Sequence, residues 1–223
     1  DDPLLECYAR IFPDLFRPFG EMSPELRAHM RYPLSMFWMQ ARQLRAYHMT
    51  DPDAFYVGED LWDLTFETYE DQPQPVEPYY VTMALPGDDS SAEFLLIYPF
   101  SPREKKVMSA WMAARCDYRE DGSGLQYGQT TIYRFPKGSD MPGPSQWESQ
   151  FLGNAEFSEW KKWQAAEVLR GNLLLFPLTQ GVLAVEPLYL RAPNTPIPML
   201  AKVMAGYVSH APGGGQIRTT IGD

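Results

Sequence analysis

The sequence has few of the side chains that bind transition metals. It contains two cysteines and three histidines among 223 residues. The histidines, His29, His48 and His210, are widely separated, and no pair of cysteines lies close to them. Since zinc sites need several such ligands at short, characteristic spacings, the pattern argues against a zinc centre. The cysteines, Cys7 and Cys116, fit either one disulfide or two thiols, and we prefer two thiols.

Long apolar runs are also missing. No window approaches the ~18 uninterrupted apolar residues that a membrane-spanning helix needs, because Pro177, Glu186 and Lys202 interrupt the longest candidates. The first residues lack the basic segment and apolar stretch of a signal peptide. We therefore expect these 223 residues to be water-soluble by themselves. Because the first residue is Asp1 and not methionine, we also expect them to be a piece of a longer protein.

Basic residues are in deficit, with 19 lysines and arginines against 29 aspartates and glutamates and a formal charge of −10. Because nucleic-acid binding depends on clustered cations that contact phosphates, we expect no nucleic-acid partner. The deficit is greatest from Asp51 to Glu93, where twelve acidic residues occur without one lysine or arginine. A solvated acidic face is our preferred interpretation. The alternative is a divalent-cation or cationic-partner site, built around Asp51, Asp53, Glu59, Asp60 and Asp63.

No phosphate-binding glycine loop or serine-nucleophile motif is present, so we expect no cofactor. Glu186 is the carboxylate with the most unusual surroundings in the sequence. It is the one charged residue between Arg170 and Arg191, inside a stretch with the composition of a core. A buried carboxylate must pair with a cation or become protonated, and we prefer a structural ion pair. The candidate partners, which are also the candidate ligand-binding residues, are Arg115, Arg134 and Arg170. The alternative is a hydrolase whose Glu186 and Asp117 face each other across a cleft, roughly 5 to 9.5 Å apart if the substrate is a glycoside.

Helix-start signals mark the first part of the chain. Ser23-Pro24-Glu25 and Asp51-Pro52 each place a capping side chain before a proline at the first helical position. Between them, apolar side chains recur at helical spacing from Leu34 to Leu44. The sequence thus predicts helices up to about Leu64. The same spacing predicts two further helices, over Glu104–Cys116 and Ser145–Leu169.

β-Branched and aromatic runs predict the strands. Residues 79–85 and 92–98 form one expected hairpin, and Thr130–Phe135 is a further strand. The clearest hairpin joins residues 172–178 and 182–190 through a connection in which Gly181 is expected to be left-handed. Since both arms are apolar on both faces, we expect a sheet covered on two sides. Met199–Val208 fits either a strand or a short helix.

Together these elements predict an α+β fold: a mixed or antiparallel β-sheet covered by helices, with a helical N-terminal part. The sheet is expected to contain the strands near residues 79, 92, 130, 172 and 182. We expect residues 1–210 to form a single soluble domain, with a helical part over 1–70 and a sheet-containing part over 79–208. Residues 211–223, which include a run of glycines, are expected to be a flexible tail.

Several stretches, in one order along the chain, carry a family resemblance. They are Met49–Tyr56, Gly58–Trp62, Tyr79–Met83, Ala110–Asp117, Tyr133–Lys137, Arg170–Leu174 and Val185–Leu190. Together they resemble Uncharacterised Protein Family 0182, a group of large bacterial membrane proteins, from about Phe12 to Tyr207. No catalytic residue is established for that family, so the resemblance assigns none here.

The resemblance implies a multipass N-terminal membrane region outside this chain, followed by a large water-soluble part that is extracytoplasmic at the cell membrane. These residues would belong to that soluble part. Our leading hypothesis is a non-catalytic interaction or ligand-recognition module at the cell envelope, with other envelope proteins or a second copy as partners. The alternatives are the envelope hydrolase that uses buried carboxylates and a module stabilised by a divalent cation.

Overall fold

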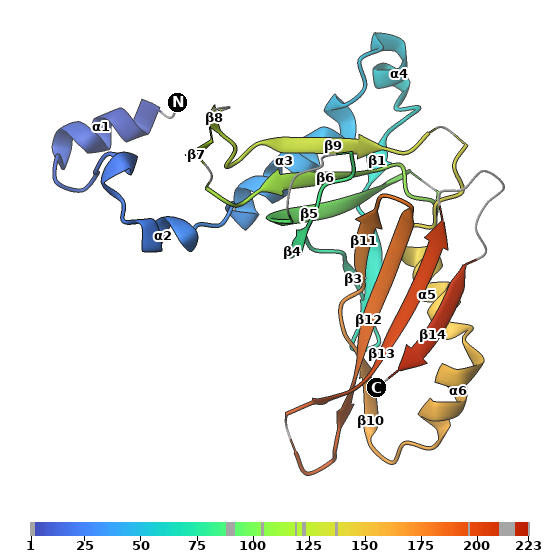
Figure 1. Ribbon diagram of the computed structural model, residues 1–223. Coiled ribbons are helices and arrows are strands. Elements are labelled where there is room, and N and C mark those ends of the chain that lie inside the picture. Colours follow the sequence, from blue (N-terminus) through green and yellow to red (C-terminus); the bar gives the residue numbers. More distant parts are fainter. Residues whose placement is uncertain are drawn as a thin grey trace.

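Two five-stranded antiparallel sheets lie across each other and form the body of the protein (Figure 1). The structure is a computed structural model and describes residues 3–87, 92–103, 105–118, 120–121, 124–136, 138–195, 197–209 and 217–222. The prediction of an α+β fold with antiparallel strands is confirmed. The number of sheets differs from the prediction, because the strands near residues 79, 92 and 130 form one sheet and those near 172 and 182 form another.

The first sheet is covered on one face by helix α3 (Leu34–Tyr47). Its strands are β1 (Trp62–Asp63), β4 (Tyr79–Met83), β5 (Glu93–Pro102), β6 (Ala110–Arg115) and β9 (Thr130–Arg134). β5 pairs with β1, β4 and β6, and β9 pairs with β6. The apolar stripe of α3 places Phe37 and Ala41 against Tyr98 and Phe100 of β5. The antiparallel pairing of β4 with β5 confirms the hairpin that the sequence predicts for residues 79–85 and 92–98.

Strand β6 occupies a stretch for which the sequence predicts a helix, Glu104–Cys116. Ala110 and Met112 pack on the α3 side of the sheet, whereas Trp111 and Ala113 pack on the opposite side. A strand buried on both faces is apolar throughout, so its apolar residues also match helical spacing. The helix prediction is wrong for this reason.

The second sheet is covered on one face by helices α5 (Pro144–Leu152) and α6 (Ala155–Lys162). Its strands are β10 (Glu167–Arg170), β11 (Leu174–Leu178), β12 (Gly181–Arg191), β13 (Met199–Ser209) and β14 (Arg218–Gly222). Trp147 of α5 lies directly on Gly206 of β13, where an added Cβ would be 2.4 Å from the indole Cζ3. The helix prediction over Ser145–Leu169 is right for α5 and α6 but wrong at its end, where β10 begins.

The C-terminal residues differ from the expected flexible tail. β14 pairs with β13, with Tyr207 opposite Arg218 and Val203 opposite Gly222. Ile221 packs against the core under the helices, which explains why this segment is ordered as a strand. Residues 211–216 and 223, together with His210, lie outside the described residues. Of the two alternatives for Met199–Val208, the structure has the strand.

The β11–β12 hairpin is confirmed, but its turn is tighter than predicted. Leu178 pairs directly with Gly181, so only Thr179 and Gln180 connect the strands. Gly181 does not have the left-handed conformation that we expect from the sequence. Glycine is required there for another reason, because a Cβ would lie 2.1 Å from the Val208 carbonyl oxygen of β13.

The N-terminal part is less helical than predicted. Its helices are α1 (Pro3–Ile11), the 3-10 helix η1 (Phe19–Glu21), α2 (Pro24–Ala28), α3 and α4 (Pro52–Val57). Strands begin at Trp62, and a hairpin follows, formed by β2 (Phe66–Tyr69) and β3 (Gln72–Pro75). A second small hairpin pairs β7 (Glu120–Asp121) with β8 (Gly124–Leu125). None of the described helices combines the length and apolarity needed to cross a membrane.

Candidate functional site

A buried arginine–carboxylate cluster lies between the second sheet and its helices. Glu186 on β12 and Arg170 on β10 are 0% and 2% exposed. The Arg170 guanidinium donates from Nε to Glu186 Oε1 at 2.5 Å and from Nη2 to Oε2 at 2.7 Å. Such a bidentate pair is stronger and more directional than a single contact. Of the three arginines named as partners of Glu186, the structure therefore selects Arg170.

Glu148 on α5 is the second carboxylate of this cluster. Its Oε2 accepts a hydrogen bond from Arg170 Nη2, and its Oε1 accepts one from the backbone N–H of Thr68 at 2.9 Å. One side chain of α5 thus contacts both β10 and the β2–β3 hairpin. Glu148 lies beside Trp147 and Phe151 on the buried side of α5, and this neighbourhood is the one sequence signal that could have identified it.

Glu67 on β2 completes the cluster where β10 and β11 separate. Its Oε2 accepts a hydrogen bond from the Leu173 backbone N–H at 2.6 Å, and its Oε1 accepts one from Asn172 Nδ2 at 2.8 Å. Gln74 of β3 also donates to Oε1, at 2.9 Å. A buried backbone N–H needs a partner, and here a carboxylate supplies the one that strand pairing does not. The cluster therefore attaches the β2–β3 hairpin to the second sheet.

Two carboxylates, those of Glu186 and Glu148, contact the Arg170 guanidinium, and the carboxylate of Glu67 lies close enough to interact with the charge of Glu186. Burial raises the pKa of Glu186 to about 7, because the loss of hydration outweighs the hydrogen bonds and charge of Arg170, and the charges of Glu148 and Glu67 raise it further. Burial by itself lowers the pKa of Arg170, but its hydrogen bonds and charge interactions with Glu186 and Glu148 raise that pKa above its usual value. Arg170 therefore stays charged, while Glu186 changes charge near neutral pH.

We expect the titration of Glu186 to lower stability as the pH rises from about 4.5 to about 7. The pKa of Glu186 is higher in the folded protein, so folding favours the protonated carboxyl. This contribution is complete below the unfolded pKa and is lost as the pH passes the folded pKa. Urea unfolding at about pH 5 and about pH 7.5 should differ by about 1–3 kcal/mol. Glu186→Gln should reduce that difference, and an equal pH dependence in both proteins would contradict the assignment.

The candidates Asp117 and Arg115 lie at the end of β6, on the first sheet. Asp117 Oδ2 accepts a hydrogen bond from the Phe94 backbone N–H at 2.9 Å. Arg115 forms an ion pair with Glu93 at 3.2 Å and donates to Gln126 Oε1 at 2.7 Å. Both side chains join neighbouring segments of the first sheet. The structure therefore brings neither of them into the cluster around Glu186.

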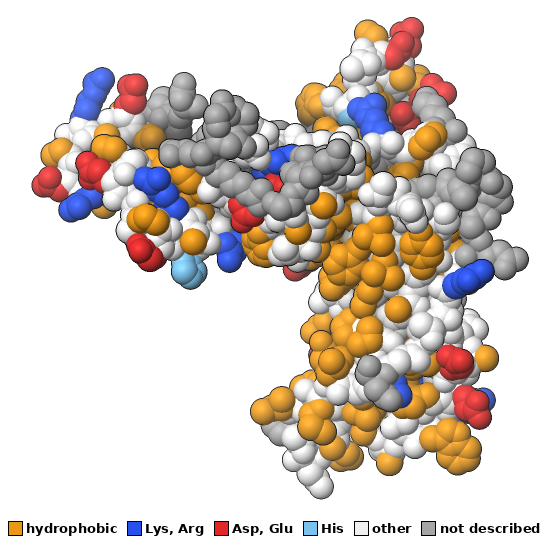
Figure 2. All heavy atoms as spheres, viewed as in Figure 1, with side chains coloured by type: hydrophobic (Ala, Val, Ile, Leu, Met, Phe, Trp, Pro, Cys, Tyr) orange, Lys and Arg blue, Asp and Glu red, His pale blue; other side chains and the backbone are white. Residues whose placement is uncertain are grey.

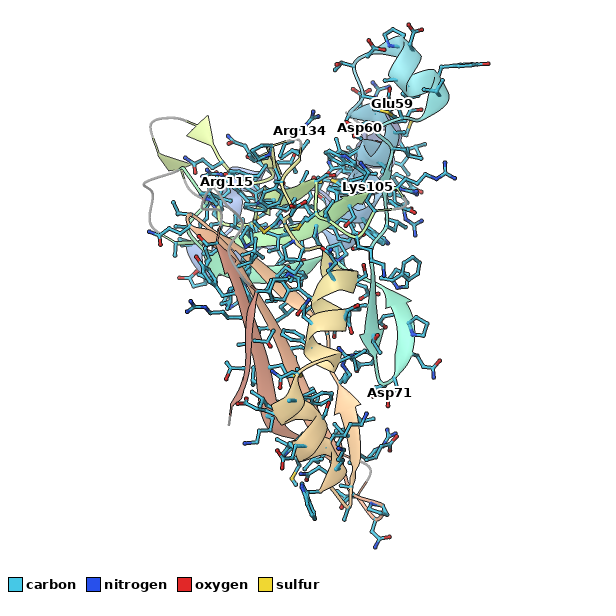
Figure 3. The ribbon with its side chains drawn as sticks, turned by 90° about the vertical axis from the view of Figure 1, so that its right-hand side faces the viewer. Glu59, Asp60, Asp71, Lys105, Arg115 and Arg134 are labelled. Atoms are coloured by element: carbon cyan, nitrogen blue, oxygen red, sulfur yellow. The ribbon has the colours of Figure 1, made fainter. Side chains whose placement is uncertain are left out.

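Arg134, the remaining candidate, lies at the end of β9. Its Nη2 donates to the His48 carbonyl oxygen at 3.3 Å, and its guanidinium lies 5.6 Å from the centre of the Trp62 ring. In Figure 3, Arg134 and Arg115 are both seen at the first sheet, above the strands of the second. Arg134 thus binds the end of α3 to the first sheet and has no role in the buried cluster.

The acidic segment does not converge on a cation site in the part of the chain that the structure describes. No group of three or more histidine, cysteine, aspartate or glutamate side chains there is arranged to hold a metal ion. Asp51 caps α4 by accepting from the backbone N–H groups of Asp53 and Ala54. Asp63 pairs with Arg45 at 2.9 Å. Figure 3 shows Glu59 and Asp60 beside α4, at the far end of the molecule from the second sheet.

Two hollows described in the structure lie away from the cluster. One is an internal void of about 10 Å³ between the two sheets, lined by Tyr79, Ile97, Tyr98, Pro99, Met108, Trp111, Leu175 and Pro177. The other is an open groove of about 530 Å³ beside the Glu167–Arg191 ion pair and residues 192–195. The void is too small for an organic ligand, and the groove includes no residue of the cluster.

The face of the second sheet opposite α5 and α6 is largely apolar, and its side chains are partly exposed. Side chains alternate across a strand, so the residues between those that contact the helices point to the other side. This outer face consists of Leu174, Leu183, Val185, Pro187, Tyr189, Val203, Ala205 and Tyr207. None of these residues is charged, and Figure 2 shows hydrophobic side chains gathered over β12 and β13. Charged side chains on the same side lie at its edges: Arg218 of β14, opposite Tyr207, and the ion pair of Glu167 and Arg191. The expectation that the strands of this hairpin are covered on two sides is met only in part. The helices α5 and α6 both pack on one side, and on the other side Phe176 of β11 packs against the first sheet.

Comparisons with known proteins agree on one family. The model of "Uncharacterised protein family (UPF0182)" matches residues 1–163. A UPF0182 protein of Microcystis aeruginosa is 41% identical over 93% of this chain and 21% of its own length. A UPF0182 protein of Desulforamulus reducens is 41% identical over 92% of this chain and 22% of its own length. A UPF0182 protein of Methanospirillum hungatei is 41% identical over 93% of this chain and 23% of its own length. The chain thus spans about a fifth of the length of these relatives, and no solved structure matches it.

Proposed function

The chain belongs to uncharacterised protein family UPF0182, and from this premise we propose that it is a non-catalytic interaction module that binds an uncharged protein surface through its outer face. The outer face is the observation that carries the proposal. Its centre is formed by adjacent strands and contains no charged side chain, and the charges of Arg218, Glu167 and Arg191 lie at its edges. Contact between apolar surface and water is unfavourable, so an extended apolar patch marks an interaction site. A charged partner surface would lose hydration at this uncharged centre without finding a counter-charge there.

The buried cluster supports a structural role rather than hydrolysis. A general acid has to reach its substrate, whereas Glu186 is 0% exposed and bonded to Arg170. Asp117 is already occupied by the backbone of Phe94 on the other sheet. We therefore assign both carboxylates to the fold and no residue to catalysis.

We further propose that the module belongs to the water-soluble, extracytoplasmic part of an integral membrane protein of the cell membrane, where its partners are other envelope proteins. The resemblance of several collinear stretches supports this placement. The length of the relatives is consistent with it, because most of such a polypeptide lies outside these 223 residues.

Thiol labelling of the full-length protein tests the proposed interface. Val185→Cys places a thiol at the centre of the outer face, and Ala165→Cys places one at an exposed site after α6 as the matched control. Both are made with Cys7→Ser, because Cys7 is exposed. A bound partner should slow maleimide labelling at position 185 in cells by about tenfold or more relative to the purified protein, with no change at position 165.

Equal labelling of position 185 in cells and after purification would contradict the proposal. Fast labelling in both states would mean that the outer face is free in the cell. Slow labelling in both states would mean that the same polypeptide covers it, and a separate partner would then be excluded.

A further inference from the structure

The N-terminal arm, residues 3–28, presents a second apolar surface that is independent of the outer face. Figure 1 shows α1 standing apart from both sheets. Most of the large apolar side chains in α1 and the residues directly after it are at least half exposed: Leu4 63%, Leu5 51%, Tyr8 52%, Ile11 66%, Phe12 51%, Leu15 66% and Phe16 41%. Such a density of exposed apolar side chains is unfavourable in water and marks a surface that packs against something else.

Three of these side chains form a stripe along α1. Leu4, Tyr8 and Ile11 follow helical spacing, so they share a side of α1. Glu6 and Arg10 form an exposed ion pair, 3.9 Å apart, on the opposite side. A nine-residue helix is only marginally stable in isolation. The stripe therefore supplies the packing that such a short helix needs.

The other end of the arm is fixed to the body. Phe19 packs against Tyr118 with ring centres 4.7 Å apart, and Arg27 lies over both rings at 5.4 and 5.3 Å. Arg27 also donates to the Gly20 carbonyl oxygen at 2.8 Å. The arm is therefore attached to the body at this end, whereas α1 stands apart from both sheets (Figure 1).

We propose that the arm packs, through this stripe, against a part of the same UPF0182 polypeptide that lies outside these 223 residues. The relatives are several times longer than the chain, which covers 21–23% of their length. A covalently attached surface is present at an effective concentration that a separate molecule does not reach, so it occupies the stripe first.

The charge of the arm disfavours a lipid surface as the occupant. The arm carries four acidic and three basic side chains. Helices that bind the surface of anionic membranes have an excess of lysine and arginine. A second copy of the chain lacks the advantage of covalent attachment, and it becomes an outcome of the experiment.

Site-specific photo-crosslinking in the full-length protein tests the inference. Cys7 is exposed and borders the apolar stripe, so p-benzoylphenylalanine at position 7 reaches whatever covers the stripe. The same probe at position 10, on the polar side, is the matched control. After irradiation and digestion, mass spectrometry identifies the joined peptides. We expect the position 7 probe to join peptides of the same polypeptide outside the 223 residues, at about fivefold or higher yield than position 10.

The double substitution Tyr8→Asp with Ile11→Asp should abolish that crosslink, because it places two charges in the stripe. The expected product keeps the mobility of a monomer. A crosslinked dimer, an adduct with lipid, an adduct with another protein, or equal yields from positions 7 and 10 would each overturn the inference. Persistence of the crosslink in the double variant would also overturn it. None of these outcomes depends on the outer face.

Discussion

Replacing Arg170 by methionine is expected to lower the free energy of unfolding by about 3–5 kcal/mol. Methionine has a similar length but no charge, so Glu186 and Glu148 would stay buried without their cation. Breaking a buried pair costs more than the pair contributes, because a buried carboxylate without its partner must either stay charged without hydration or take up a proton. Urea denaturation at about pH 7 measures the difference.

Arg191→Met is the matched control for this prediction. Arg191 and Glu167 form an ion pair on the same two strands, β12 and β10, but their side chains are 36% and 55% exposed. An exposed pair contributes about 0–1 kcal/mol, so the control should lose little stability. Equal small losses in Arg170→Met and Arg191→Met would contradict the structural role of the cluster.

A second variant keeps the prediction testable if Arg170→Met does not fold. Combining it with Glu148→Met and Glu186→Met removes every charge from the central contacts of the cluster. Apolar replacement of a whole buried ionic group is often neutral or stabilising. The triple variant should therefore fold, and a triple variant that is less stable than Arg170→Met alone would contradict the account.

Trp147→Ala is expected to lower the free energy of unfolding by about 3–5 kcal/mol through the cavity that it leaves. The Trp147 indole is 0% exposed and lies between α5 and the second sheet, on Gly206. Gly206 has no side chain with which to fill the space. Trp163→Ala is the matched control, because Trp163 is 81% exposed, and it should change stability by less than about 0.5 kcal/mol.

A double-mutant cycle with Gly206→Ala tests whether this contact is the cause. In the wild type, the added methyl group would lie 2.4 Å from Trp147 Cζ3, so Gly206→Ala should destabilise the protein. In the Trp147→Ala background the 2.4 Å contact is absent and the nearest remaining atom is Phe151 Cε1 at 3.2 Å, so the same substitution should cost much less stability. An identical effect of Gly206→Ala in both backgrounds would be inconsistent with the contact.

Local signals in the sequence predict the local parts of the structure. Ser23 caps α2 by accepting from the Leu26 N–H at 3.4 Å, and Asp51 caps α4, as their positions before proline indicate. The two long hairpins follow from runs of β-branched and aromatic residues. The isolation of Glu186 in an apolar stretch correctly indicates a buried carboxylate that requires an arginine.

The parts that the sequence does not predict depend on contacts between distant segments. Glu67 and Glu148 face Arg170 or its neighbours only after β2 and α5 dock on the second sheet. The neighbours of Glu148, Trp147 and Phe151, indicate that it is buried, but nothing near either residue in the sequence indicates which side chain it meets. Strand β6 is mistaken for a helix because burial on both faces removes the alternation that identifies a strand. The division into two sheets likewise depends on which strands pair, which periodicity does not specify.

The contact between Glu67 and Leu173 also has a consequence for the order in which the chain folds. It joins residues that are 106 positions apart, and Tyr79 contacts Leu175 across 96 positions. Closing such long loops costs chain entropy before any contact compensates for it, which slows folding. The β4–β5 and β11–β12 hairpins need only short loops. We infer that these local hairpins form early and that attachment of β2–β3 to residues 171–173, which seals the charges of the cluster from water, comes last.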